Sequence, residues 1–169
     1  MKTILFLFAV LIFGLVSCNN ATSNRSVEIN GVRWATRNID TPGNFARNPE
    51  SAGGFFTFEE AQNACPRGWR LPTGAELESL RNAAGGEWTA MSGVNGRTFG
   101  IEPNRVFLPA AGLRVMSGSL SNVGTNGFYW SSSPSTGTTS AMYLFFRQDV
   151  SSVGHARHTD GMSVRCVAE

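Results

Sequence analysis

The stretch Cys65-Pro66-Arg67-Gly68-Trp69-Arg70-Leu71-Pro72-Thr73 separates two short segments with helical patterns. Its two prolines restrict the backbone and its glycine permits a sharp turn, which together predict a rigid bend. Trp69 and Leu71 supply apolar surface that this bend can bury. We therefore expect the stretch to anchor the chain between two helices, with Cys65 as a candidate for a covalent crosslink.

Both neighbouring segments begin with a helix-capping pattern, Thr57-Phe58-Glu59-Glu60 and Thr73-Gly74-Ala75-Glu76. In each, threonine is the cap and glutamate follows three residues later. Pro66 predicts that the first helix ends at Cys65, and Gly85-Gly86 predicts the end of the second. The predicted apolar faces consist of Phe58, Ala61 and Cys65 in the first helix and of Leu77, Leu80 and Ala84 in the second.

Strand patterns occupy most of the remaining chain. Val27-Glu28-Ile29 and Val32-Arg33-Trp34-Ala35 flank Asn30-Gly31, which predicts a tight hairpin. Beyond Gly86 the chain is rich in Gly, Ser, Thr and Asn, and residues 131–140 resemble a flexible loop. Further strands are predicted at residues 106–108, 128–130, 142–146 and 162–167, with Pro109 and Pro134 ending two of them. Helices followed by strands predict an α+β fold, in which two short helices pack on antiparallel sheets with long loops.

The N-terminal segment has the features of an export signal. Lys2 precedes an apolar run at residues 4–16, which is shorter than the roughly 20 residues needed to span a bilayer. The ending Leu15-Val16-Ser17-Cys18 resembles a bacterial lipobox, in which the cysteine is acylated after cleavage. An ordinary secretory leader with a chance cysteine is the alternative. The expected organisation is a lipoprotein signal peptide at 1–17, a lipidated N-terminus and short tether at 18–26, and a single domain at 27–169.

The charge balance argues against a nucleic-acid partner. Lys2 is the only lysine, so the chain after the leader carries 13 arginines, scattered along its length, against 12 aspartates and glutamates. We expect contact with a membrane through the lipid anchor on Cys18. If Cys18 carries lipid, Cys65 and Cys166 remain as an even pair in an exported protein, where disulfides persist.

Five motifs occur in an order that resembles one known family. They are Gly31-Val32-Arg33-Trp34-Ala35-Thr36-Arg37-Asn38-Ile39, the stretch from Cys65 to Thr73, Phe107-Leu108-Pro109-Ala110-Ala111-Gly112, Tyr129-Trp130-Ser131-Ser132 and Val164-Arg165-Cys166-Val167. This order is similar to the Fib_succ_major family of envelope proteins in gut and rumen bacteria. The resemblance implies a C-type-lectin-like fold, export as a lipoprotein or as part of a surface protein, and no established activity.

Two of these motifs also resemble formylglycine-generating enzymes. Arg70-Leu71-Pro72-Thr73-x-Ala75-Glu76 and the ending Val164-Arg165-Cys166 carry the similarity. Those enzymes use a further pair of redox cysteines near the C-terminus, whereas Cys166 is the only cysteine after Cys65 here. We therefore expect the fold without the oxidase, and no enzyme.

A disulfide between Cys65 and Cys166 is the expected crosslink. Cys65 shares a helical face with Phe58 and Ala61, and Cys166 alternates in phase with Met162 and Val164, so both should face the core. C-type-lectin-like folds commonly join the first helix to the last strand by a disulfide, so the resemblance implies this pairing. Two buried free thiols are the alternative.

No metal, cofactor or catalytic site is expected. Glu102-Pro103-Asn104 matches the calcium- and sugar-binding tripeptide of mannose-type lectins, but the Trp-Asn-Asp motif that completes that site is missing. His155, His158 and Asp160 offer two imidazoles and a carboxylate, but the local residues suggest a loop or strand end without the defined geometry of a metal site, and we interpret them as a solvated polar loop. The paired carboxylates Glu59-Glu60 and Glu76/Glu78 lie on predicted helices, where capping or solvent-facing roles are expected.

Large aromatic side chains are the remaining candidates for ligand binding. Most should lie in the core, but a ring exposed beside Asn, Ser and Arg would suit recognition of a sugar or a protein. We expect Trp88, which follows Gly85-Gly86 in a predicted loop, to be the most exposed of the candidates. The candidate ligand-binding residues are Trp88, Tyr129 and Trp130.

These observations favour a lipid-anchored protein of the outer membrane with a non-catalytic binding domain for glycan or protein. The alternative is a structural or accessory subunit of a surface appendage or envelope assembly. Asn19-Asn20-Ala21-Thr22 has no acidic residue of the kind that often follows the cysteine in surface-exported lipoproteins, which slightly favours the periplasmic face. The sequence leaves the choice between the two faces open.

Replacing Cys18 with Ala should release the protein from the membrane fraction, because the acyl chains on Cys18 are the expected anchor. Fractionation and uptake of labelled fatty acid by the wild type measure this directly. A Cys18→Ala protein that still sediments with membranes, together with a wild type that takes up no label, would contradict lipidation.

Overall fold

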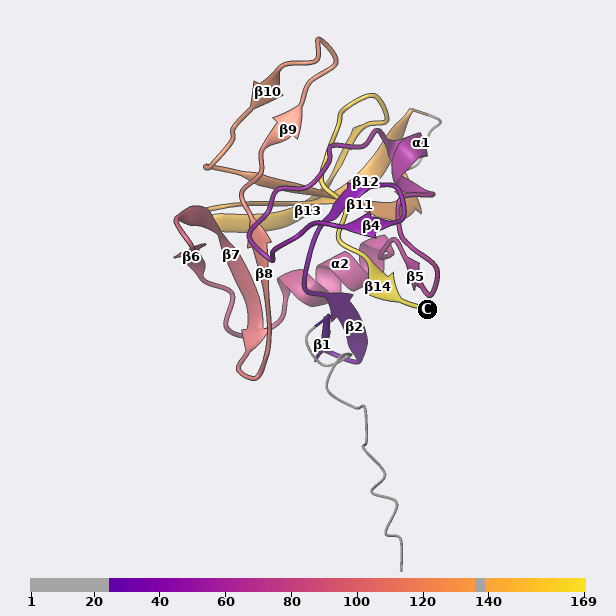
Figure 1. Cartoon of the computed structure of the whole chain (residues 1–169). Coiled ribbons are helices and arrows are strands. Elements are labelled where there is room, and N and C mark those ends of the chain that lie inside the picture. Colours follow the sequence, from indigo (N-terminus) through magenta and orange to yellow (C-terminus); the bar gives the residue numbers. More distant parts are fainter. Residues whose placement is uncertain (1–24, 136–138) are drawn as a thin grey trace, which may run out of the picture.

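The structure, a computed structural model, describes residues 25–135 and 139–169 (Figure 1). The described chain is mostly β-structure in five small sheets, with only two helices, α1 (Phe58–Ala61) and α2 (Gly74–Arg81). The predicted α+β, C-type-lectin-like fold is therefore wrong. Segments rich in glycine and serine, in which the sequence shows no apolar run, are paired into strands by backbone hydrogen bonds.

The first sheet brings both ends of the domain together. It contains β1 (Ser26–Ile29), β2 (Val32–Ala35), β14 (Val167–Ala168) and β5 (Trp69–Arg70), in the order β1-β2-β14-β5. The predicted hairpin is confirmed, because β1 and β2 pair antiparallel around Asn30 and Gly31, both at positive φ. Val167 pairs with Trp34 on one side and with Arg70 on the other, so the central bend is part of the same sheet as the C-terminus.

Two three-stranded antiparallel sheets form the body of the domain. Their strands are β6 (Trp88–Met91), β7 (Val94–Ile101) and β8 (Asn104–Pro109) in one sheet, and β11 (Gly127–Pro134), β12 (Ser140–Arg147) and β13 (Val150–Arg157) in the other. Two small hairpins complete the β-structure, β3 (Ile39–Thr41) with β4 (Asn44–Phe45), and β9 (Leu113–Arg114) with β10 (Leu120–Ser121). The β9–β10 hairpin projects from the body (Figure 1).

Two adjacent hydrophobic clusters fill the interior. In the first, Leu77 and Leu80 of α2 meet Trp34, Phe99 and Phe146, and α2 packs against strands of the β11–β13 sheet. In the second, Phe58 and Ala61 of α1 meet buried residues that include Trp130, Met162 and Cys166. Each short helix therefore covers one part of a largely β core.

The helix starts were predicted correctly and the helix ends were not. Thr57 with Glu60 and Thr73 with Glu76 form complete capping boxes. The first helix ends at Ala61 rather than Cys65, and the second at Arg81 rather than near Gly85. A capping box acts locally and is visible in sequence, whereas these ends are set by how the chain turns into the next packed segment.

Other sequence predictions also require correction. Of residues 162–167, only Val167 lies in a strand, while Met162 and Ser163 form isolated bridges with Phe56 and Tyr129. Residues 131–134 of the predicted loop belong to β11, because their backbone continues the sheet despite a serine-rich composition. Residues 136–138 lie outside the described residues.

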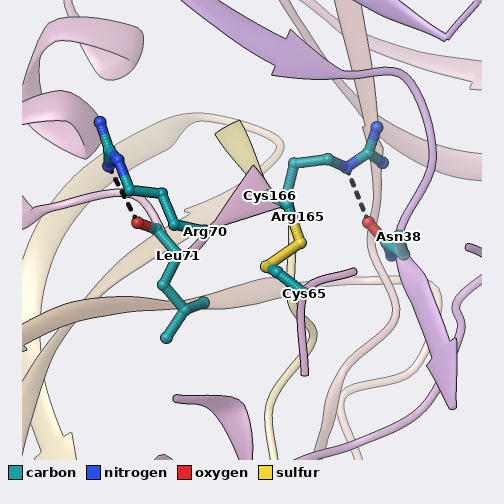
Figure 2. The surroundings of a disulfide bond; sticks show 6 residues. All are labelled: Asn38, Cys65, Arg70, Leu71, Arg165 and Cys166. Atoms are coloured by element: carbon teal, nitrogen blue, oxygen red, sulfur yellow. Dashed lines mark hydrogen bonds between the residues drawn. A yellow bond between two sulfur atoms is a disulfide. The ribbon is translucent and has the colours of Figure 1, made fainter. Parts of the chain in front are cut away.

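The expected disulfide is confirmed, since the sulfur atoms of Cys65 and Cys166 are bonded and their Cα atoms are 6.0 Å apart (Figure 2). The two cysteines are 101 residues apart in the sequence, and Cys166 is fully buried. The crosslink therefore ties the start of the central bend to the C-terminal segment. The second cluster packs around it.

A buried arginine lies next to this crosslink (Figure 2). Arg165 is only 1% exposed and donates hydrogen bonds to the side-chain oxygen of Asn38 (2.9 Å) and to the carbonyl oxygens of Ala35 (3.0 Å) and Phe107 (3.1 Å). Asn38 in turn donates to the hydroxyl of Tyr129 (3.3 Å), which donates to the carbonyl of Pro109 (2.8 Å). Burial lowers the pKa of Arg165 to about 10 and raises the pKa of Tyr129 to about 12.

The candidate lipidation site Cys18 lies outside the described residues, as do the signal peptide at 1–17 and most of the tether at 18–26. Within residues 25–135 and 139–169, no helix is both long enough and apolar enough to cross a membrane.

Loss of the disulfide should strongly destabilise the domain. Because the crosslink spans 101 residues, the double variant Cys65→Ala/Cys166→Ala should lose on the order of 4–5 kcal/mol of unfolding free energy in the chain-entropy model. Guanidinium unfolding measures this difference. As a control, a reductant should destabilise the wild type and leave the double variant unchanged. Equal unfolding midpoints for wild type and double variant would contradict the prediction.

Glu76 should make stability depend on pH in the acidic range. Its carboxylate accepts two hydrogen bonds from Arg70 (2.7 and 2.8 Å) and one from the backbone N–H of Thr73 (2.7 Å). Led by the bond from Arg70, these contacts lower the pKa of Glu76 to about 2. A lowered carboxyl pKa stabilises the fold above the unfolded value near 4.5, and this contribution is lost as the pH falls from 4.5 towards 2.

Glu76→Gln should therefore cost about 1 kcal/mol at pH 7, because the Arg70 partner is 42% exposed and solvent screens the pair. Below pH 4.5 the difference from the wild type should shrink. Unfolding free energies measured between pH 7 and pH 2 test both points, with Glu78→Gln on the same helix as a matched control. A pH-independent difference between Glu76→Gln and wild type would rule out this assignment.

Candidate functional site

Two of the three predicted ligand-binding residues are in the core. Tyr129 and Trp130 are both 0% exposed. The hydroxyl of Tyr129 bonds to Pro109, and the indole N–H of Trp130 donates to the carbonyl oxygen of Phe56 (2.8 Å). The prediction that these two rings bind a ligand is wrong, because the polar group of each ring is satisfied inside the fold.

Trp88 is different, because it is half-buried and borders a surface hollow. It lies at the start of β6 rather than in the predicted loop, opposite Arg97 of β7. The ring packs against the first hydrophobic cluster. Its indole N–H has no acceptor within the described part of the chain. Trp88 is thus held by the core and still accessible from the hollow.

The hollow has a volume of about 400 Å³ and forms where three distant segments meet. These are the β6–β7 hairpin, the turn that precedes β11, and the turn between β12 and β13. Its lining residues are Trp88, Asn95, Gly124, Thr125, Asn126, Arg147, Gln148 and Asp149. The volume falls towards the lower end of the roughly 300–1,000 Å³ typical of small-ligand pockets.

Two side chains of β7 hold the walls of this hollow. Arg97 donates to the carbonyl oxygens of Arg147 (3.4 Å), Gln148 (3.3 Å) and Gly86 (3.0 Å), which ties the β12–β13 turn to the segment before β6. Asn95 donates to the carbonyl oxygen of Gly124 (3.0 Å) and so ties the second turn to the same strand. Asn95 and Arg97, two residues apart on β7, therefore hold both turns in place.

Several polar side chains of these turns have no hydrogen-bond or ion-pair partner in the described chain. Within residues 25–135 and 139–169, the side chains of Asn126, Arg147, Gln148 and Asp149 make no hydrogen bond or ion pair. Arg147 supplies only donors, Asp149 supplies only acceptors, and the two amides supply both. Among the lining residues, Arg147 and Asp149 carry one formal charge of each sign.

The hollow beside His158 is built around a histidine that contacts α1. It is lined by Glu59, Thr139, Arg157, His158 and Thr159. The ring of His158 stacks on Phe58 with centroids 4.4 Å apart, and its Nδ1 lies 3.2 Å from the Glu59 carboxylate. His155 lies on β13. The contact between His158 and Glu59 and the stack on Phe58 pack α1 against the end of β13, and the buried Nε2 of His158 has no hydrogen-bond partner in the described chain.

The other carboxylates that the sequence offered as candidates cap helices or pair with arginines. Glu60 and Glu76 complete the capping boxes, as predicted, and Glu78 pairs with Arg81 (2.8 Å). Glu102 lies in the β7–β8 turn, 3.7 Å from Arg105. The described residues contain no group of three or more His, Cys, Asp or Glu side chains that could hold a metal ion.

Sequence reasoning singled out Trp88 and missed its neighbours. Arg147-Gln148-Asp149 becomes a turn only because residues 150–157 form β13, and those residues show no clear strand pattern in the sequence. The Asn- and Gly-containing segment 122–126 signals a turn, but nothing local shows which strand it meets. The packing of three segments creates the site.

Comparison with known proteins places the chain in a family. The chain matches no curated protein and no solved structure. The family model described as Fibrobacter succinogenes major domain (Fib_succ_major) matches residues 18–168, almost the whole chain and all of the elements described above. This match confirms the resemblance seen in the five sequence motifs, and the protein therefore belongs to the Fibrobacter succinogenes major domain family.

Proposed function

We propose that this protein is a lipid-anchored component of the bacterial envelope whose domain is a non-catalytic, glycan-binding module. Membership of the family suggests a surface or envelope protein domain. The lipobox-like ending at Cys18 supports an anchor, and the balanced charge gives no support for a nucleic-acid partner.

The observation that carries the proposal is the hollow beside Trp88. It combines an accessible aromatic ring with amide, guanidinium and carboxylate groups that the fold leaves unengaged. The fold satisfies the buried guanidinium of Arg165 with three acceptors, whereas it leaves these groups beside Trp88 without partners in the described chain. Unengaged polar groups gathered around an aromatic ring favour a binding surface. Sugars present both hydroxyl groups and apolar C–H faces, and this set of side chains is suited to both.

The lining residues support binding rather than hydrolysis. Glycosidases generally use two carboxyl groups on either side of the scissile bond. Asp149 is the only carboxylate among the residues that line the hollow. A module that binds a glycan without cleaving it fits this composition.

The place of β1 in the body is compatible with a ligand that approaches from the side away from the membrane. The tether leads into β1, which lies at the opposite end of the body from β9 and β10 (Figure 1). The turn that forms one wall of the hollow follows β10 directly in the chain. A domain held through β1 would therefore present the β9–β10 end, with this turn, away from the lipid surface.

A structural role in an envelope assembly is the second candidate. The projecting β9–β10 hairpin and the turn after it expose Met116 (78%), Leu120 (55%) and Val123 (58%). The chain carries no charged residue between Arg114 and Arg147, so this apolar surface suits an apolar protein neighbour in an assembly. The double variant Met116→Ser/Leu120→Ser tests this role without touching the hollow.

Screening the purified lipoprotein in detergent against a glycan array distinguishes the two functions. We expect retention on a limited set of glycans, equal for wild type and Met116→Ser/Leu120→Ser, because the hairpin lies outside the hollow. No retained glycan, together with a change in sedimentation of envelope complexes in the hairpin variant, would favour the assembly role and contradict glycan binding.

A further inference from the structure

We infer that the hollow beside Trp88 takes a neutral, hydroxyl-rich sugar ring, which stacks on the indole and is oriented by Arg147, Gln148 and Asp149. The inference rests on the proposed glycan-binding function and adds to it the class of sugar and the side chains that select it. The argument depends on three properties of the hollow: its aromatic surface, its charge balance and the rigidity of its walls.

Trp88 supplies the flat apolar surface. Its backbone is fixed by antiparallel pairing of β6 with β7, and its ring packs on the first hydrophobic cluster. A ring that is already immobilised loses little conformational entropy when a ligand stacks on it. The indole N–H, which has no acceptor in the described chain, can donate to a sugar oxygen at the edge of the stack.

The polar side chains select a neutral ligand. A hydroxyl group both donates and accepts, so it can satisfy the donors of Arg147 and the acceptors of Asp149 at once. A phosphate or sulfate would gain from Arg147 and be repelled by Asp149, and an amine would have the reverse pattern. The Arg97 guanidinium donates to three carbonyl oxygens, so Arg147 and Asp149 are the charged lining groups left to meet a ligand, and a neutral polyol can bond to both.

The walls are rigid enough to give specificity. Arg97 donates to the backbone carbonyl oxygens of Arg147 and Gln148, which leaves their side chains free to meet the ligand. Asn95 fixes the opposite wall through Gly124. Since both anchors come from β7, the backbones of the two walls keep their spacing, which lowers the entropic cost of binding. The volume of about 400 Å³ suits one or two sugar rings.

The experiment compares neutral, anionic and cationic glycans on one array, followed by titration of the strongest neutral oligosaccharide by calorimetry. Trp88→Ala should weaken binding by about tenfold or more, and Trp88→Phe should retain part of it, because a smaller ring still stacks. Asp149→Asn should weaken binding by about tenfold, because it removes a charged acceptor and keeps the shape.

Matched controls are Thr89→Ala, on the same strand as Trp88, and Glu102→Gln, an exposed carboxylate in another turn. Both should bind within about twofold of the wild type, since neither residue lines the hollow. Circular dichroism and the presence of the disulfide verify folding of each variant. If Trp88→Ala is misfolded, Asp149→Asn and Gln148→Ala carry the test, because both residues are exposed.

The possible outcomes separate this inference from the function on which it rests. Glycan retention that is unchanged in Trp88→Ala and Asp149→Asn overturns the site and leaves glycan binding intact. Retention of anionic or cationic glycans alone overturns the selection of a neutral sugar. No retention of any glycan overturns the proposed function and the inference together.

Discussion

The buried guanidinium of Arg165 is the constraint on which the rest of the fold depends. At neutral pH it carries a charge that is 1% exposed, and no carboxylate in the described chain pairs with it. Its donors must therefore be satisfied by oxygens held in place by other segments, namely Ala35 at the end of β2, Asn38 before β3, and Phe107 in β8. An unsatisfied buried polar group costs about 1–3 kcal/mol, and more when it is charged, so these segments keep one arrangement. The adjacent Cys65–Cys166 bond ties the central bend to the same point.

The Arg165 hydrogen bonds and the disulfide explain how a domain with little helix can hold the hollow beside Trp88 in one shape. The β6–β7–β8 sheet is held by Phe107 and Phe99 in the interior, and its β7 strand extends outward at Asn95 and Arg97. Those two side chains hold the turn that precedes β11 and the turn between β12 and β13. The hollow is therefore connected to the core through one strand, and its aromatic member, Trp88, is also packed on the core. The contacts of β7 and the packing of Trp88 on the core therefore support both the shape of the hollow and the fold.

Part of the structure could be predicted because its signals are local. A capping box needs only a threonine and a glutamate three residues apart, and the Asn30-Gly31 turn needs only two residues that accept positive φ. The strands β7 and β13 could not be recognised, since VNGRTFGI and VSSVGHAR contain glycine and polar residues that pair only when the neighbouring strand is present. The expected α+β class failed for that reason, because too much of the glycine- and serine-rich half was assigned to loops.

The sequence by itself determined the family, the two helix starts, the first hairpin and the disulfide, and it singled out Trp88. Each rests on a short motif or on an ordered set of motifs, which a linear chain displays directly, and the disulfide pairing follows from the family resemblance that those motifs carry. Only the tertiary structure decided that Tyr129 and Trp130 are core residues, that Arg165 is buried with three acceptors, and that Asn126 and Asp149 lie beside Trp88. These facts depend on contacts between residues far apart in the chain, and such contacts exist only once the apolar clusters have brought the segments together.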